Sequence, residues 1–434
     1  MTARPLGTSH TAAVVVGSMI GTGVFMTTGL ILPDVPSPAL VLAVWAAAGL
    51  LALCGAAVYA ELGTMMPRVG GEYVYLSRAY GPALGFLSGW VALTAGFAAP
   101  TAAGAIGFAT YLHAVVPGLS ATPIAVAVVI VFTAAHMADV RFGARLQSAL
   151  AVVVVAVIVV FVVAAFTVGH GNWSNVTSSL TIARPGGGIA AAGGVAVALV
   201  QVSYSYSGWN GAAYVAGEVR DPGRTLPRAL VLATGLVTAL YLALNLVFLY
   251  ATPAAALAGK KEVAHAAAVA LFGPGGAVLI SSLVALASAG FVSAMLMSGP
   301  RVVVAMAHDG VFFRALGGTN ARGAPTLAVG LQGALAIIAV LTATYDRILV
   351  YVGFALTLNA AAAVVAAFVL RRRDPAAERP FRTPLWPASG LLFVALSAFM
   401  LVFAVRERPL ETGAALATLI AGGVAYAMWH RRRR

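Results

Sequence analysis

Long apolar runs separated by short polar loops fill most of this 434-residue chain. A helix needs about 20 apolar residues to cross a bilayer, and twelve runs approach or exceed that length. Hydrophobic residues make up 61% of the chain and charged residues only 9%. No soluble fold of this length can cover so much apolar surface with polar groups. The sequence therefore predicts an all-α polytopic membrane protein. It excludes a soluble enzyme and a disulfide scaffold, since Cys54 is the single cysteine.

The twelve predicted spans are 11–33, 38–65, 83–115, 123–138, 146–169, 189–217, 228–251, 264–306, 326–343, 347–370, 385–405 and 412–430. In the eighth span, 264–272 is expected to form a short re-entrant or surface helix before a Gly-Pro-Gly-Gly break at 273–276. The polar lead 1–10 has no signal-peptide pattern, so we expect the first span to be retained.

The distribution of basic residues predicts the orientation of the spans. With the N-terminus in the cytoplasm, 20 of the 26 Lys and Arg residues fall on the cytoplasmic side, as the positive-inside rule requires. We therefore expect a cytoplasmic-membrane protein with both termini in the cytoplasm. The net charge of +13 does not indicate nucleic-acid binding, because the arginines are scattered between apolar runs instead of clustered on one soluble face.

Two spans contain stretches that disfavour a continuous helix. Span 1 carries GSMIGTGVF at 17–25, and span 6 carries SYSYSGWNG at 203–211. Each glycine costs a helix about 1 kcal/mol relative to alanine. Non-helical backbone is tolerated at membrane depth only where it lines a cavity or is buried in protein. Taken alone, Gly17 and Gly21 would also fit a Gly-x-x-x-Gly helix-packing contact.

The two breaks are five helices apart, so the two spans enter the membrane from opposite sides. Interrupted helices at matching places in two halves are typical of an inverted-repeat transporter with a substrate site at the midplane. The predicted organisation is a lead at 1–10, five-helix repeats at 11–169 and 189–370, two further helices in 385–430, and an arginine tail at 431–434.

The chemistry of a broken helix predicts what binds there. The N–H groups that open the second half, together with the positive end of the helix dipole, favour a carboxylate. The carbonyls that end the first half can accept hydrogen bonds from an ammonium group. All 13 acidic residues fall in predicted loops or last helical turns, so we expect no acidic side chain at the site. This pattern favours a neutral amino acid over a polyamine or another cation.

Four stretches resemble signatures of the amino acid–polyamine–organocation transporter superfamily. They are GSMIGTGVF at 17–25, YAELGTMMPRVGGEYVYLSRAYG at 59–81, YSGWNGAAYVAGEVRDPGRTLPRAL at 206–230 and RVVVAMAHDGVFF at 301–313. The resemblance covers roughly residues 8–380. Tyr-Ser-Gly-Trp-Asn at 206–210 most resembles the L-type amino acid transporter branch and its bacterial relatives. The last two helices carry no signature.

The resemblance implies a leucine-transporter-type fold with alternating access around helices 1 and 6. The substrate-binding residues that it implies are Met19, Ile20, Gly21, Thr22, Gly23, Tyr204, Ser205, Ser207, Trp209 and Asn210. On helix 1, the N–H groups of residues 21–23 are expected to bind the carboxylate, and the carbonyls of Met19 and Ile20 to receive the amine. A simpler reading is that the Thr22 hydroxyl bonds a carbonyl of its own helix.

On helix 6, the resemblance implies that carbonyls near Tyr204 and Ser207 also receive the amine. Tyr204 is expected to close the site from outside as a gate, and Trp209 and Asn210 to shape it. The alternative is that the two aromatic residues belong to an interfacial belt, although they lie deep within span 6.

Other polar residues have two readings each. Asn359 either lines the cavity or joins helices. His136 and His308 are expected to be helix-end partners more than proton relays. Six charged residues are expected to form ion pairs that close the cytoplasmic side, the alternative being separate solvated charges. They are Glu61, Arg68, Glu72, Glu218, Arg220 and Asp221.

The coupling ion is not determined by the sequence. Many relatives carry a lysine in the middle of helix 5, and the corresponding position here is Val154. By resemblance, a sodium site would use carbonyls of Gly17, Ile20 and Ala289 and the Ser293 hydroxyl. The neighbouring position, Val292, offers no oxygen. Sodium coupling, exchange or facilitated uptake, and proton coupling by another group therefore all stay open.

The function predicted from the sequence is secondary active transport or exchange of small neutral L-amino acids. The alternatives are a non-transporting sensor on the same fold and a carrier of a related amine or organocation. A channel is disfavoured because no span carries a filter motif or a charged ring. We expect no catalytic residues, no metal site and no cofactor. The expected partners are an amino acid and the lipid bilayer, with no obligate protein partner and no nucleic acid.

Overall fold

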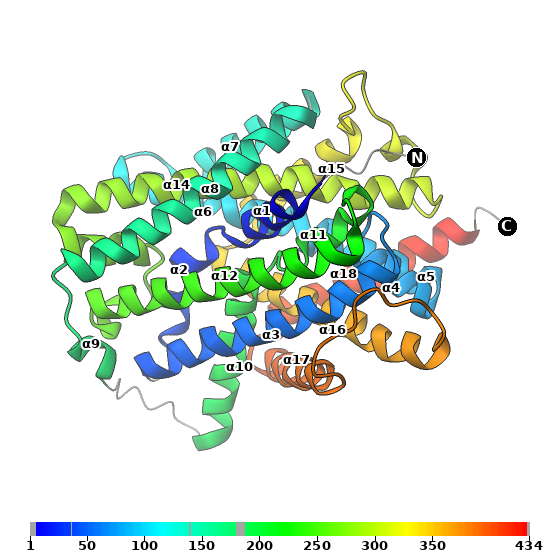
Figure 1. Cartoon of the computed structure of the whole chain (residues 1–434). Helices are drawn as coiled ribbons and strands as arrows, with labels where there is room; N and C mark the ends of the chain where they lie inside the picture. Colours follow the sequence, from blue (N-terminus) through cyan, green and yellow to red (C-terminus); the bar gives the residue numbers. More distant parts are fainter. Residues whose placement is uncertain (1–5, 36, 139, 179–186, 432–434) are drawn as a thin grey trace.

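The computed structural model describes residues 6–35, 37–138, 140–178 and 187–431 (Figure 1). Within these ranges the regular structure is helical, and β-pairing is limited to an isolated bridge between Leu6 and Val219. Ten helices of the described part are long and apolar enough to cross a membrane. Two shorter apolar helices, Val152–Thr167 and Thr326–Thr342, complete the twelve predicted spans, which confirms the all-α polytopic fold.

The helices up to residue 178 are α1 (Thr8–Met19), α2 (Gly23–Ile31), α3 (Pro38–Met65), α4 (Glu72–Tyr80), α5 (Pro82–Val91), α6 (Ala99–Val115), α7 (Ala121–Ala138), α8 (Val140–Thr167) and α9 (Ser174–Thr177). The helices from residue 187 onward are α10 (Gly187–Tyr206), α11 (Gly211–Tyr214), α12 (Pro222–Ala251), α13 (Ala254–Leu257), α14 (Val263–His308), α15 (Thr326–Thr342), α16 (Tyr345–Arg373), α17 (Ala388–Glu407) and α18 (Pro409–Arg431). Short 3₁₀ turns lie at Ala216–Glu218 and Arg314–Gly317, and a π-helical segment at Ala92–Ala98 joins α5 to α6.

Spans 1 and 6 are both interrupted, as the sequence predicts. In span 1, α1 ends at Met19, Ile20 takes an extended conformation, and α2 begins at Gly23. In span 6, α10 ends at Tyr206 and α11 begins at Gly211, with Gly208 at a φ of 98° that side chains rarely adopt. The predicted break in the eighth span is also present, because Gly273 has a φ of 75° inside α14.

The interrupted helices lie in the interior of the bundle. In the segment Thr8–Ile31, 89% of the most apolar stretch is buried, whereas the figure for Pro409–Trp429 is 17%. Outer helices instead expose large apolar side chains, among them Val160, Leu341 and Ile420, which are 62% to 68% exposed. An exposed apolar surface of this kind is what a lipid-facing belt requires.

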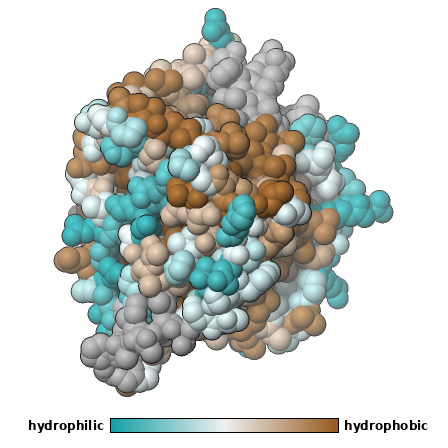
Figure 2. Space-filling model, turned by 90° about the vertical axis from the view of Figure 1, so that its left-hand side faces the viewer, coloured by the Kyte–Doolittle hydropathy of each residue, from teal (hydrophilic) through white to brown (hydrophobic). Residues whose placement is uncertain are grey.

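The two ends of the bundle differ in charge. The charged end, as we call it, contains α4, α11 and the ion pairs Arg68–Asp309 and Arg371–Glu61. The start of α1 and the end of α18 lie at this same end (Figure 1). Figure 2 views the opposite end, where hydrophilic residues are scattered across a surface with large apolar areas.

Candidate substrate site

The two helix breaks pack directly against each other. A Cβ atom on Gly23 would lie 2.6 Å from the Ser205 Oγ and 2.8 Å from the Ser205 Cα. A Cβ atom on Gly208 would overlap the carbonyl of Ser18. Both glycines are therefore needed for helix 1 and helix 6 to approach at the level of their breaks.

The start of α2 presents backbone donors beside this contact. Among the described residues, the N–H groups of Gly21, Thr22 and Gly23 form no hydrogen bond with another backbone group. The Thr22 hydroxyl accepts a hydrogen bond of 3.1 Å from the Tyr345 hydroxyl, instead of bonding a carbonyl of its own helix. The space beside Gly21 is occupied by the Phe291 ring, since a Cβ atom there would lie 2.6 Å from the ring. Phe291 therefore packs directly against the helix 1 break at Gly21.

Tyr241 of α12 joins the two breaks, and the sequence reasoning missed it. Its hydroxyl lies 2.6 Å from the Met19 carbonyl and 3.1 Å from the Ser205 carbonyl. One carbonyl predicted to receive the substrate amine therefore already accepts a hydrogen bond. A lone tyrosine in the middle of an apolar run was the available signal, because a hydroxyl at membrane depth needs a partner.

The predicted gate residue is buried next to a second tyrosine. Tyr204 is 3% exposed, and its ring meets the Tyr345 ring edge-on with 6.4 Å between centroids. Tyr345 begins α16 at the end of the bundle opposite the charged end. The Ser205 hydroxyl lies 3.0 Å from the Thr27 hydroxyl and so belongs to the contact between helices 1 and 6.

A small cavity of about 40 Å³ lies on the other side of the helix 6 break. By volume it has room for a few water molecules, since one water needs about 10–15 Å³. The predicted residues that line it are Tyr204, Ser207, Trp209 and Asn210. The predicted helix 1 residues, Met19 to Gly23, do not line it. The other walls come from α3, α16, α17 and the side chain of Glu72.

Glu72 is the buried acidic group of this cavity, and it contradicts the expectation that no acid lies at the site. Its Oε1 accepts hydrogen bonds of 2.7 Å from the Tyr59 hydroxyl and from Asn210 Nδ2, and its Oε2 accepts one from the Tyr214 hydroxyl. Burial raises the pKa of this carboxyl, and the three hydrogen bonds oppose the rise. The prediction failed because α4 folds back under helix 6, although it lies between two spans in the sequence.

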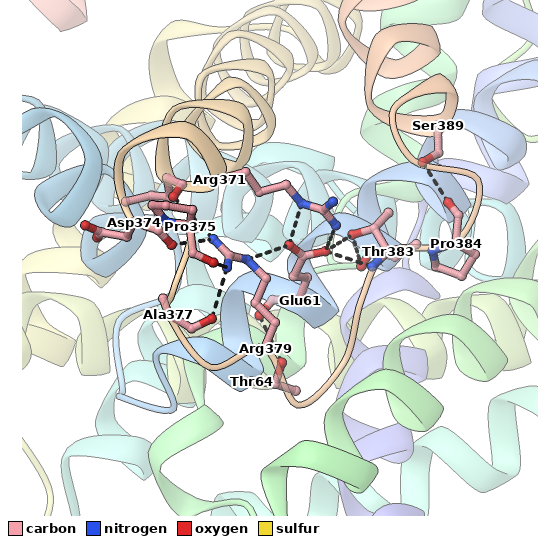
Figure 3. A network of polar contacts seen from close by, with 12 residues as sticks. Glu61, Thr64, Arg371, Asp374, Pro375, Ala377, Arg379, Thr383, Pro384 and Ser389 are labelled. Atoms are coloured by element: carbon pink, nitrogen blue, oxygen red, sulfur yellow. Dashed lines mark hydrogen bonds and ion pairs between the residues drawn. The ribbon is translucent and has the colours of Figure 1, made fainter.

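A second buried carboxylate, Glu61 near the end of α3, lies in a different environment (Figure 3). Arg371 Nε donates to its Oε1 at 2.8 Å, and Arg379 Nε lies 3.5 Å from the same oxygen. The backbone N–H and the hydroxyl of Thr383 each donate to Oε2 at 2.7 Å. Arg371 also lies 4.1 Å from the centre of the Trp386 ring. Glu61 thus binds α3 to the end of α16 and the loop that follows it.

The predicted cluster of six charges is correct only in part. Arg68 pairs with Asp309 at 3.5 Å, and Glu218 pairs with Arg301 at 3.3 Å. The partners of these residues therefore come from outside the predicted set. Including Glu72 among the ion pairs was wrong, because its donors within the described ranges are the neutral side chains of two tyrosines and an asparagine. The partners come from helices distant in sequence, with Arg301 inside α14 and Asp309 at its end.

The predicted ion-site residues have a neighbour that the sequence did not indicate. His136 of α7 is buried, and its Nε2 lies 2.9 Å from the Ser293 Oγ. His136 lies in the last turn of α7, as expected, but its hydrogen bond goes to the side chain of Ser293 on α14 instead of to the end of a helix. Val154, at the position of the coupling lysine, is buried on α8. Gly17 is buried on α1 and Ala289 is half-buried on α14.

Comparisons with known proteins agree with this architecture. The amino acid permease family profile matches residues 6–426. The chain belongs to the amino acid permease family. It is 28% identical to the serine/threonine exchanger SteT of Bacillus subtilis, over 99% of this chain and 98% of that protein.

Two human relatives are similar over most of their length. The large neutral amino acids transporter small subunit 2 is 28% identical over 98% of this chain and 80% of its own length. The b(0,+)-type amino acid transporter 1 is 26% identical over 94% of this chain and 83% of its own length. The permease is therefore a multi-pass membrane protein that transports amino acids, and it is not an enzyme.

Proposed function

We propose that this permease exchanges or takes up small neutral L-amino acids by alternating access, with the substrate held where helices 1 and 6 are broken. The observation that supports this most is the start of α2, where three consecutive N–H groups lack a backbone partner beside the helix 6 break. A carboxylate is the ligand that such a helix start favours. We further propose that the charged end faces the cytoplasm, following the excess of arginine in its loops.

Phe291 and Tyr204 are the side chains that would admit and enclose the substrate. The Phe291 ring packs against Gly21, so it would form one wall of a carboxylate site at the start of α2. Tyr204 and Tyr345 lie together near Thr22 at the opposite side of the break from the charged end. This position suits a gate toward the outside. Substrate-dependent movement of these rings would enclose the ligand without any charged side chain.

Counterflow in proteoliposomes tests the proposal. Vesicles loaded with one unlabelled amino acid should accumulate the same labelled amino acid, and empty vesicles should not. Serine and threonine are the first substrates to try, since a full-length relative is a serine/threonine exchanger. Alanine, leucine, glutamate and lysine complete the first panel. Accumulation of no neutral amino acid on this panel would contradict the proposal.

A cationic substrate is the second candidate, because Glu72 places a carboxylate in the cavity beside the helix 6 break. Its two oxygens already accept three hydrogen bonds, which makes it a poor direct ligand for an ammonium group. Lysine, arginine and putrescine in the same counterflow assay separate the two candidates. Transport of these cations, without transport of neutral amino acids, would establish the second.

A further inference from the structure

Glu72 is a buried carboxylate, and its hydrogen-bond donors in the described part of the chain are neutral. The side chain is 2% exposed and receives its three hydrogen bonds from Tyr59 of α3, Asn210 and Tyr214. The side chain of Asn359 lies beside the same carboxyl and is a further neutral donor that favours its charged form. A buried charge usually needs an ionic partner, because leaving water costs it several kcal/mol.

The charged groups of the surrounding elements have other partners. On α3, Glu61 pairs with Arg371 of α16. On α4 itself, Arg78 pairs with Asp374, and both side chains are partly exposed. These cations do not neutralise the Glu72 charge by contact.

The titratable groups that face Glu72 are tyrosines. They are Tyr59 from α3, Tyr75 from α4 and Tyr214 from α11. The sequence of α5, which packs against α4, contains no titratable side chain. Since tyrosine is neutral at physiological pH, none of these groups supplies a counter-charge. The ligand that can neutralise Glu72 without a rearrangement of the protein is a proton.

The Glu72 carboxyl also forms part of the cavity wall. Glu72 lines it together with Ser203, whose hydroxyl is buried without a hydrogen-bond partner in the described part of the chain. A cavity of about 40 Å³ that carries the Glu72 carboxyl and the Ser203 hydroxyl on its walls has room for water that reaches the carboxyl. Oε2 accepts a hydrogen bond from Tyr214 and has a second lone pair that can take a proton.

Glu72 is also hydrogen-bonded to the segment that follows the helix 6 break. Asn210 immediately precedes α11 and Tyr214 ends it, so both bonds hold α11 against α4. Next to Asn210, Gly211 lies against Ser18 of helix 1. Hydrogen bonds to a charged acceptor are roughly twice as strong as those to a neutral one. The charged carboxylate therefore holds α11 in place, and the neutral carboxyl holds it less.

We propose that Glu72 is a proton-binding site whose protonation releases α11, so that the carrier changes its access only with the neutral carboxyl. The proton passes from water in the cavity to Oε2, and it returns to water when the cavity opens on the other side. No other atom is exchanged. The proposal rests on the proposed transport function and adds the group that links its rate to pH.

The test is the pH dependence of counterflow, measured with equal pH on both sides of the vesicle membrane. Wild-type counterflow should fall at least about tenfold between about pH 5 and pH 9, a range that brackets a raised glutamate pKa. Glu72→Gln is always neutral, so its counterflow should vary less than about twofold over that range. Glu218→Gln, which removes a partly exposed carboxylate outside the cavity, should keep the wild-type profile.

The outcomes separate two failures. If the wild type shows no counterflow of any tested amino acid at any pH, the transport function is contradicted. If the wild type transports but Glu72→Gln keeps the same fall with pH, or if the wild type shows no fall, the role of Glu72 is contradicted.

A second variant keeps the carboxyl in case Glu72→Gln does not fold. Tyr214→Phe removes the donor to Oε2, which stabilises the charged form, so the pH at which counterflow is half-maximal should rise. An unchanged midpoint would overturn the proposal. Infrared spectra of the purified protein give a readout that needs no transport. A protonated-carboxyl band should titrate in the wild type and be missing in Glu72→Gln, and its persistence in the variant would also overturn the proposal.

Discussion

Two buried carboxylates near the charged end differ in the partners they have. Glu61 contacts two arginines and the Thr383 backbone, whereas the donors to Glu72 among the described residues are two tyrosines and an asparagine. Both side chains are nearly inaccessible to solvent. The arginines around Glu61 favour a carboxylate that stays ionised. The neutral donors around Glu72 suit a carboxyl group that can be either ionised or protonated.

The positions of the two groups match that difference. Glu61 joins the end of α3 to the loop after α16, in a part of the bundle that has no helix break (Figure 3). Glu72 bonds the segment directly after the helix 6 break. In the proposed mechanism, the ion pairs of Glu61 lie in the part that stays fixed, and the neutral hydrogen bonds of Glu72 lie beside the helix break that is proposed to move.

The largest effect is expected from breaking the Glu61 cluster. Glu61→Ala leaves Arg371 and Arg379 without their carboxylate, and loss of one partner of a buried pair costs about 3–5 kcal/mol. The unfolding temperature of the purified protein measures this loss. Glu218→Ala breaks a pair that is about one-third exposed and should cost no more than about 1 kcal/mol. Equal destabilisation by both variants would contradict the conclusion that the buried Glu61 cluster contributes more to stability than the partly exposed Glu218–Arg301 pair.

A branched side chain at Gly23 should disrupt the contact between the breaks of helices 1 and 6 without affecting the Glu61 cluster. Its Cβ would lie 2.8 Å from the Ser205 Cα, so Gly23→Val must push the two breaks apart. Overpacking costs about 1–3 kcal/mol, and counterflow should fall at least about tenfold. Gly413→Val is the matched control, since a Cβ there meets nothing within 4 Å. Wild-type binding and counterflow in Gly23→Val would place the substrate site elsewhere.

Replacing Arg371 by lysine tests whether the Glu61 cluster needs the geometry of the guanidinium group as well as its positive charge. Lysine keeps the charge but cannot donate to both Glu61 oxygens in parallel or stack on Trp386. We expect a loss of about 1–2 kcal/mol in stability and an unchanged pH profile of counterflow. Arg372→Lys, at the exposed neighbouring position, should be neutral. A shifted pH profile in Arg371→Lys would mean that the two carboxylates are coupled.

The smallest effect is expected from Tyr59→Phe. The Tyr59 hydroxyl shares Glu72 Oε1 with Asn210, so one donor to that oxygen is left after the substitution. Losing a donor to the charged form raises the pKa of Glu72. The fall of counterflow should therefore move to higher pH, by less than in Tyr214→Phe. A midpoint that moves to lower pH would contradict the assignment of Glu72 as the titrating group.

Local composition was enough to predict where the helices break. Gly21 to Gly23 and Ser207 to Asn210 combine glycine with polar residues inside apolar runs, and the structure breaks both helices there. The kink at Gly273 follows from the same kind of signal. These features depend on a few residues that are neighbours along the chain, so they can be predicted from the sequence alone.

Contacts between distant segments could not be predicted in this way. The position of Glu72 depends on the turn before α4, where Gly71 has a φ of 56° and a Cβ would lie 2.8 Å from the Tyr214 ring. His136 and Ser293 are 157 residues apart, and Tyr241 reaches carbonyls in two other helices. The hydrophobic periodicity of one helix does not indicate which residues of another helix will contact it.

The sequence by itself determined the membrane environment, the number of spans and the two breaks, because hydropathy and helix propensity are summed over neighbours along the chain. Tertiary structure alone decided which carboxylate is paired with arginine and which lies in a cavity among neutral donors. Glu61 and Glu72 are eleven positions apart and chemically identical. Their difference comes from the partners that α16 and α11 bring to them, since burial and nearby charge set the behaviour of a carboxyl group.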